Sequence, residues 1–102
     1  MAWNADTQFS GKLGPLNAEI GNTTYAASGQ ATTVAITTSL RTIYSAIASA
    51  NGTMADGVET YSIPTGDVTG GEVTITRSLQ EDNGGTVTYV DGMQVSYLLV
   101  GI

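Results

Sequence analysis

Hydrophobic and polar residues alternate in several short segments of this chain. In residues 32–38, Val34 and Ile36 share one face and small or hydroxylated residues occupy the other. Residues 72–79 repeat the alternation, with apolar side chains at nearly every second position. A period of two residues is typical of a strand with one buried face. Arg77 falls on the apolar face of the second segment, so we expect it near a strand end or beside a carboxylate.

Three further segments have strand-like patterns. Residues 94–100 begin by alternating and end in a continuous apolar run. Such a run is typical of a strand that is covered on both faces. Residues 58–63 form a shorter run that Pro64 closes, and residues 86–90 form another. We predict a strand over each of the three.

Residues 40–50 fit two patterns. The helical spacing i, i+3, i+4, i+7 is met by Leu40, Ile43, Tyr44 and Ile47. A strand would instead place Ile43 and Ile47 on one face and Tyr44 on the other. The Thr-rich residues that precede this segment, and the strands predicted around it, favour a strand.

Turn residues separate the predicted strands at intervals of roughly ten residues. This spacing predicts an all-β chain folded as an antiparallel β-sandwich or a jelly-roll-like barrel. The length of 102 residues fits a single domain, residues 1–102. The turn residues are Asn51-Gly52, Asp56-Gly57, Gly70-Gly71, Asn83-Gly84-Gly85 and Asp91-Gly92.

The opening segment has a weaker pattern. In residues 1–22 the apolar side chains are spread among polar ones, and Gly11, Gly14 and Pro15 are expected to interrupt a strand ladder. Two interpretations remain for this segment: an edge strand packed on the domain, or an N-terminal arm that reaches a neighbouring subunit.

The net charge of the chain limits the classes of macromolecule that it is expected to bind. The chain has 3 Lys or Arg against 9 Asp or Glu, a net charge of -6. Because the three basic residues are also far apart in the sequence, we expect no nucleic-acid or membrane binding. Charged residues make up only 12% of the chain, well below the ~25% of ordinary domains. A surface so poor in charge favours contact with further copies, so we predict a homo-oligomer.

The chain lacks several of the residue types that enzymes use for catalysis. The chain has no Cys and no His, which excludes thiolate nucleophiles, imidazole bases and the usual zinc sites. Glu81 and Asp82 are adjacent, so on extended backbone their carboxylates point apart. Asp67, Glu72 and Asp91 have no EF-hand spacing. We therefore predict a protein that is not an enzyme and needs no cofactor or metal.

Exposed aromatic rings beside polar side chains can bind sugars. Tyr89, with Asp91 and Gln94, is the best candidate for such a ligand site in this chain. Tyrosines at alternating strand positions also serve in core and cross-strand packing. Both interpretations of Tyr89 stay open at this point.

Four segments carry a resemblance to a known class of protein. They are residues 9–16 (Phe-Ser-Gly-Lys-Leu-Gly-Pro-Leu), 34–43, 71–77 and 95–102 (Val-Ser-Tyr-Leu-Leu-Val-Gly-Ile). Their layout resembles small bacteriophage virion structural proteins. It is similar, more loosely, to the six-stranded H-type lectin sandwich of tail fibres and invertebrate agglutinins, which forms trimers.

The resemblance implies a non-enzymatic virion structural protein, foremost a capsid decoration or cement-type trimer. The partners would be further copies of the chain and a major capsid or tail protein. The alternative is a carbohydrate-binding module of a tail fibre or host-recognition appendage, with a glycan as ligand. The first residues lack the basic start and apolar stretch of a secretory signal, so we expect synthesis in the host cytoplasm and a final place in the virion.

Overall fold

A computed structural model describes residues 7–50, 58–80 and 89–102 of the chain. Within these ranges the backbone forms strands and no helix. The strands are β1 (Thr7–Leu13), β2 (Leu16–Thr24), β3 (Thr33–Thr37), β4 (Thr42–Ala50), β5 (Val58–Ser62), β6 (Gly66–Asp67), β7 (Glu72–Gln80) and β8 (Gln94–Gly101). The all-β prediction is confirmed, and four of the predicted strand segments correspond to β3, β5, β7 and β8.

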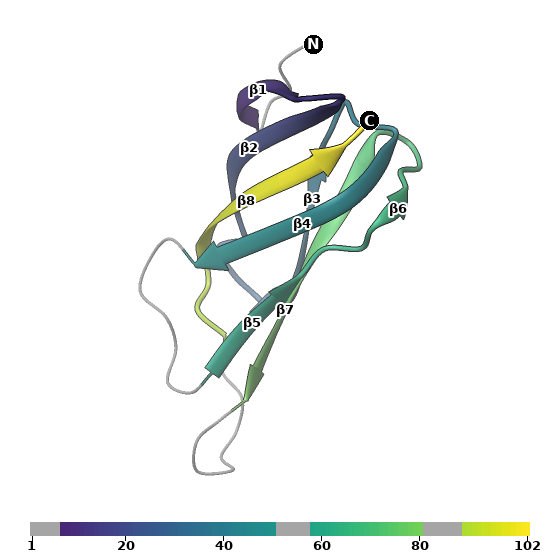
Figure 1. Cartoon of the computed structure of the whole chain (residues 1–102). Helices are drawn as coiled ribbons and strands as arrows, with labels where there is room; N and C mark the ends of the chain where they lie inside the picture. Colours follow the sequence, from purple (N-terminus) through teal and green to yellow (C-terminus); the bar gives the residue numbers. More distant parts are fainter. Residues whose placement is uncertain (1–6, 51–57, 81–88) are drawn as a thin grey trace.

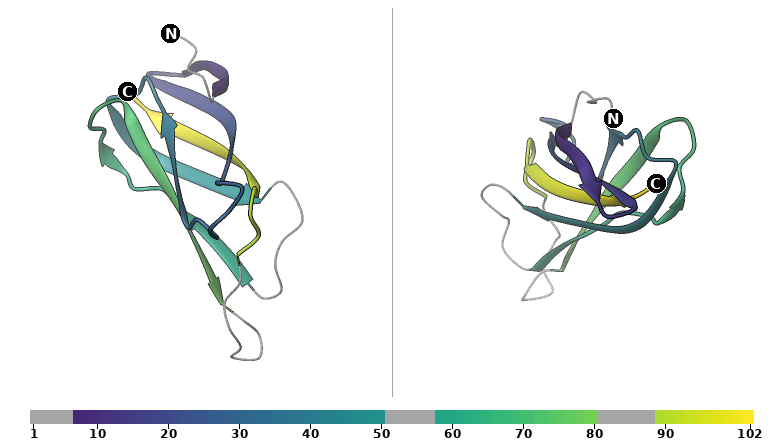
Figure 2. Two further views of the ribbon diagram at one scale, coloured as in Figure 1. Left: turned by 180° about the vertical axis from the view of Figure 1, so that it is seen from behind. Right: turned by 45° about the horizontal axis from the view of Figure 1, so that its top comes forward.

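The strands form two antiparallel sheets. One has the order β1-β2-β8-β4-β6 and the other the order β3-β7-β5. Figure 1 shows β2, β8 and β4 side by side in one layer, and the view from behind in Figure 2 brings β3 and β7 forward. The pairing is nested: β2 pairs with β8, and β3 pairs with β7. Partners far apart in the sequence therefore hold both sheets together.

Both sheets contribute side chains to one hydrophobic core. Alternate positions of β7 and β8 point inward, as the period of two residues predicted. The strand residues that are buried in this core are Ile36, Ile43, Val73, Ile75, Val95, Tyr97 and Leu99.

Residues 40–50 contain a strand, so the strand interpretation is confirmed over the helical one. The prediction that Ile43 and Ile47 share a face is wrong. Ile43 is buried, whereas 65% of Ile47 is exposed. The pairing of β4 with β8 shifts register between Ile43 and Ser45. Such a bulge adds one residue to β4, so every side chain after it changes face.

Of the N-terminal segment 1–22, residues 7–13 form the edge strand β1, whereas residues 16–22 belong to β2, which pairs with both β1 and β8. β1 pairs with β2 at the edge of the five-stranded sheet, and the ladder runs on through Gly11 opposite Ala18. The expected interruption at Gly11 is therefore wrong. The chain reverses at Gly14, whose φ of 61° favours glycine. Residues 1–6 lie outside the described residues.

Two predicted turns are seen directly. Gly70, Gly71 and Gly92 have positive φ, as reversals of this kind require. The turns at 51–52, 56–57 and 83–85 lie outside the described residues. So does most of the predicted strand 86–90, whose last two residues, Tyr89 and Val90, are not in a strand.

Candidate functional site

Exposed apolar side chains gather on the outward side of β2, β8 and β4, where Ile20, Tyr44 and Ile47 lie. We call this surface the outer face. The small central residues of β8 and β4 leave a hollow of about 240 Å³ in it. The outer face comprises Ile20, Asn22, Ser45, Ile47, Ser49, Ser96, Leu98 and Val100, with Tyr44 at the bulge.

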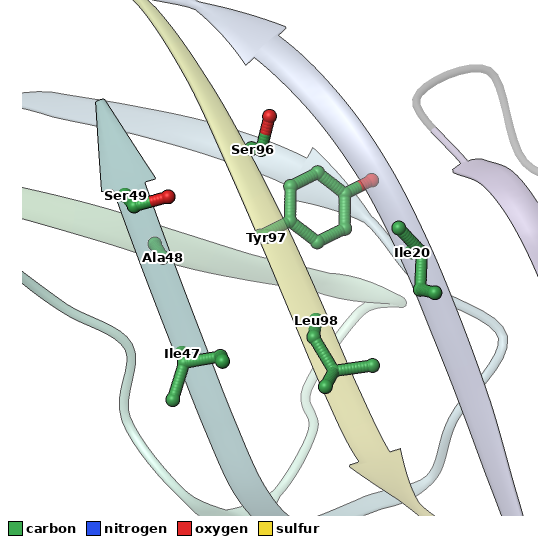
Figure 3. A pocket seen from close by; sticks show the side chains of 7 residues that line it. All are labelled: Ile20, Ile47, Ala48, Ser49, Ser96, Tyr97 and Leu98. Carbon is green, nitrogen blue, oxygen red and sulfur yellow. The ribbon is translucent and has the colours of Figure 1, made fainter. Parts of the chain in front are cut away.

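Strand register arranges the outer face in rows. Ile20 lies opposite Leu98, and Leu98 lies opposite Ile47. Figure 3 shows these three side chains across neighbouring strands at the hollow. Ile20 is 44% exposed and Ile47 65% exposed. The next row holds polar groups, in which the Ser96 hydroxyl donates a 2.7 Å hydrogen bond to Asn22 Oδ1.

The outer face has no charged side chain. Among all the residues of β2, β4 and β8, Glu19 alone is charged, and it is fully buried. Lys12 on β1 and Asp67 on β6 lie at the two flanks of the sheet. The low charge content of the sequence thus leaves the outer face without charged side chains.

The apolar run at the end of β8 predicted a strand covered on both faces. On the inward side Val95, Tyr97 and Leu99 are buried, but Leu98 and Val100 on the outer face stay partly exposed. Within the described residues, the chain covers one side of β8 only. The run therefore has the apolar composition of a strand buried on both faces, although only its inward face is buried.

A buried carboxylate joins the two sheets. Glu19 on β2 accepts a 2.6 Å hydrogen bond from the Thr38 hydroxyl, a 3.2 Å bond from the Ser39 amide and a short one from the Ser39 hydroxyl. Thr38 Oγ1 in turn accepts the Leu40 amide at 3.1 Å. These bonds fix the connection between β3 and β4. Sequence analysis missed Glu19, because no periodic pattern marked β2.

Arg77 on β7 is 1% exposed. Its Nε donates to the Ala31 carbonyl at 2.8 Å and its Nη1 to the Val90 carbonyl at 2.9 Å. The guanidinium lies 4.2 Å from the ring centre of Tyr25 and 5.0 Å from that of Tyr89. Carbonyl oxygens and ring faces can thus also satisfy a buried guanidinium, and the sequence pattern did not indicate these partners.

The predicted ligand residues have defined places. The Tyr89 ring is half-buried and one side of it faces Arg77. Asp91 Oδ1 accepts the Gln30 amide at 2.8 Å, and Gln30 Oε1 accepts the Tyr89 amide at 3.0 Å. Gln94 is exposed at the start of β8. Tyr89 and Asp91 therefore meet at one loop cluster around Gln30, where their contacts position backbone.

The acidic side chains of the described residues are dispersed. Within residues 7–50, 58–80 and 89–102, no three His, Cys, Asp or Glu side chains gather as metal ligands would. Asp67 and Glu72 line a second hollow, of about 250 Å³, with the loop after Pro64. Among the described residues no helix is long and apolar enough to span a membrane.

Comparisons with known proteins give no identification. No family model matches the chain, and neither a curated protein nor a solved structure matches it. The residues and their geometry are therefore what any functional conclusion rests on.

Proposed function

We propose that this chain is a non-enzymatic structural protein of a bacteriophage virion, a homo-oligomer that decorates or cements a capsid. The observation that carries the proposal is the uncharged, apolar outer face of β2, β8 and β4. An apolar patch on a domain surface often marks a site of contact with another protein. A virion protein is assembled through such contacts.

The fold supports the same proposal. We take the two sheets to form a sandwich, because both contribute to one core. The nested pairing of β2 with β8 and β3 with β7 supports the inference of a jelly-roll-like arrangement, an architecture that viral capsid domains use. A fold class hosts many functions, so this likeness strengthens the proposal without carrying it.

No disulfide stabilises the fold, since the chain has no Cys. A domain of about 100 residues has a stability of only ~5–15 kcal/mol. Association with further copies adds stability by mass action, because the partner binds the folded state. Oligomer formation would therefore supply the durability that a particle outside the cell requires.

The test is the molar mass of the purified chain by light scattering over a range of micromolar concentrations. We expect a mass above that of one 10.5 kDa chain. A monomer at every concentration would contradict self-association. The position of the gene tests the virion assignment: a neighbouring major capsid gene supports decoration, and neighbouring fibre genes would place the protein in the tail instead.

A further inference from the structure

The rows of the outer face have a symmetry of their own. On either side of Leu98 lie two isoleucines, Ile20 and Ile47, at the same height along the sheet. The adjacent row has Ser96 in the centre, with Asn22 and Ser49 on either side. In both rows, β2 and β4 thus present side chains of similar size and polarity on the two sides of β8.

This arrangement is compatible with a two-fold axis that runs parallel to β8 above Leu98. Such an axis exchanges β2 of one copy with β4 of the other and leaves each row at its own height. Ile20 then faces Ile47 of the second copy, and Leu98 faces Leu98. The row of hydroxyl and amide groups likewise faces the same row of the second copy, with Ser96 opposite Ser96 and Asn22 opposite Ser49. In a two-fold contact the same patch serves both copies, so it must be complementary to itself, and the rows of Leu98 and Ser96 meet this condition.

The absence of charge on the outer face also permits a second copy as the occupant. Each chain carries a net charge of -6, so two copies repel at most orientations. The outer face brings no carboxylate into the contact, since Glu19 is buried beneath it. A basic partner would find no acidic side chain here to bind. An uncharged apolar surface fits this one, and the chain itself supplies such a surface.

The area suffices for a reversible pair. With strands about 4.8 Å apart and a rise of about 3.3 Å per residue, three strands of eight or nine residues cover roughly 400 Å² per copy. Two facing copies together would bury roughly 800 Å², which is in the range of weak, transient interfaces. We therefore expect an association that micromolar concentrations drive.

We propose that two copies of this chain pack their outer faces together about a two-fold axis along β8, with Ile47 of each copy against Ile20 of the other. The proposal deepens the proposed function, because it rests on self-association and assigns its surface and symmetry. The two-sided cover that the apolar run of β8 predicts is then supplied by the second copy. The contact relates two copies and differs from the three-fold assembly that the resemblance implies.

The test uses charge at the two facing positions. Ile47→Lys and Ile20→Glu each place an unpaired charge in the contact, so each variant alone should dimerise about 100-fold more weakly than the natural chain. Both side chains are substantially exposed in one copy, so each variant should keep the β-rich circular dichroism spectrum. Thr74→Lys, an exposed position on β7 in the other sheet, adds the same charge as a matched control and should leave dimerisation unchanged.

Mixing the two variants tests the symmetry itself. In a mixed pair the introduced lysine faces the introduced glutamate at one position, and the natural isoleucines meet at the other. We expect equimolar Ile47→Lys and Ile20→Glu to recover a dimer that neither forms alone, measured by sedimentation velocity. A natural chain that is trimeric, or dimers that both variants leave intact, would overturn this contact while self-association stands. A monomeric natural chain would overturn both proposals.

Discussion

The carboxylate of Glu19 on β2 and the hydroxyl of Thr38, which follows β3, meet at 2.6 Å across 19 residues of sequence. Glu19 is fully buried and also binds the amide and hydroxyl of Ser39. Bonds of a carboxylate to such donors are among the stronger hydrogen bonds in proteins. This contact ties the five-stranded sheet to the loop that leaves the three-stranded one.

We predict that Glu19→Gln lowers the free energy of unfolding by about 1–3 kcal/mol, because the amide NH₂ cannot accept the bonds that the second oxygen accepts. Urea denaturation followed by circular dichroism measures the loss. Glu72→Gln, an exposed carboxylate on β7, is the control and should change the midpoint little. Equal midpoints for both variants would contradict a structural role for Glu19.

Arg77 offers a second test of a buried polar group. Arg77→Lys keeps the charge but loses the planar fork that reaches the Ala31 and Val90 carbonyls together. We expect a loss of about 2–4 kcal/mol, since two carbonyl bonds and two ring contacts are weakened. Arg41→Lys, at an exposed position, should cost little. A variant Arg77→Lys as stable as the natural chain would show that these contacts contribute nothing.

Gly101 is required by a close backbone approach. A Cβ on this residue would lie 1.8 Å from the Thr42 carbonyl oxygen, beside the bulge of β4. We predict that Gly101→Ala forces β4 and β8 apart and costs about 2–3 kcal/mol or more. Gly92→Ala is the comparison, because its φ of 69° is unfavourable but its Cβ would meet nothing within 4 Å. Thermal unfolding should rank Gly101→Ala as the more damaging variant.

Asp91→Ala separates loop positioning from ligand binding. Asp91 accepts the amide of Gln30, whose φ is 51°, so its removal should cost about 0.5–2 kcal/mol of stability. If Tyr89, Asp91 and Gln94 bind a glycan, as the alternative function requires, a glycan array should give a signal that Gln94→Ala weakens. An array without signal would leave Asp91 with its structural role alone.

Salt should strengthen the two-fold pair. Each copy carries a charge of -6, and at physiological ionic strength screening acts over about 8 Å. Because the outer face has no charge to screen, added salt reduces only the repulsion between copies. Sedimentation in low and high sodium chloride should show tighter dimers at high salt. Weaker association at high salt would mean that ion pairs, and not the apolar rows, hold the copies together.

Much of the fold could be predicted from local pattern. The alternation in residues 32–38 and 72–79 gave β3 and β7, because a half-buried strand needs one apolar side chain in every two residues. The strand at 40–50 followed from its neighbours. β2 could not be found in this way, since its inward face carries Glu19 and Gly21 where an apolar pattern would stand.

The candidate site could be predicted only in part. Low charge content pointed to contact with other copies, but not to the place. The outer face exists where it does because the bulge after Ile43 turns Ile47 outward to the row of Leu98. A single extra residue in β4 leaves no trace in a period-two pattern, so its position could not be inferred.

The sequence by itself determined that the chain is all-β, acidic and poor in charge, because these properties follow from local alternation and composition. Tertiary structure decided which strands pair, where Glu19 and Arg77 find their partners, and which apolar side chains stay in water. The reason is that register and burial depend on contacts between residues far apart in the chain, such as Ile20 with Leu98, and no local pattern encodes them.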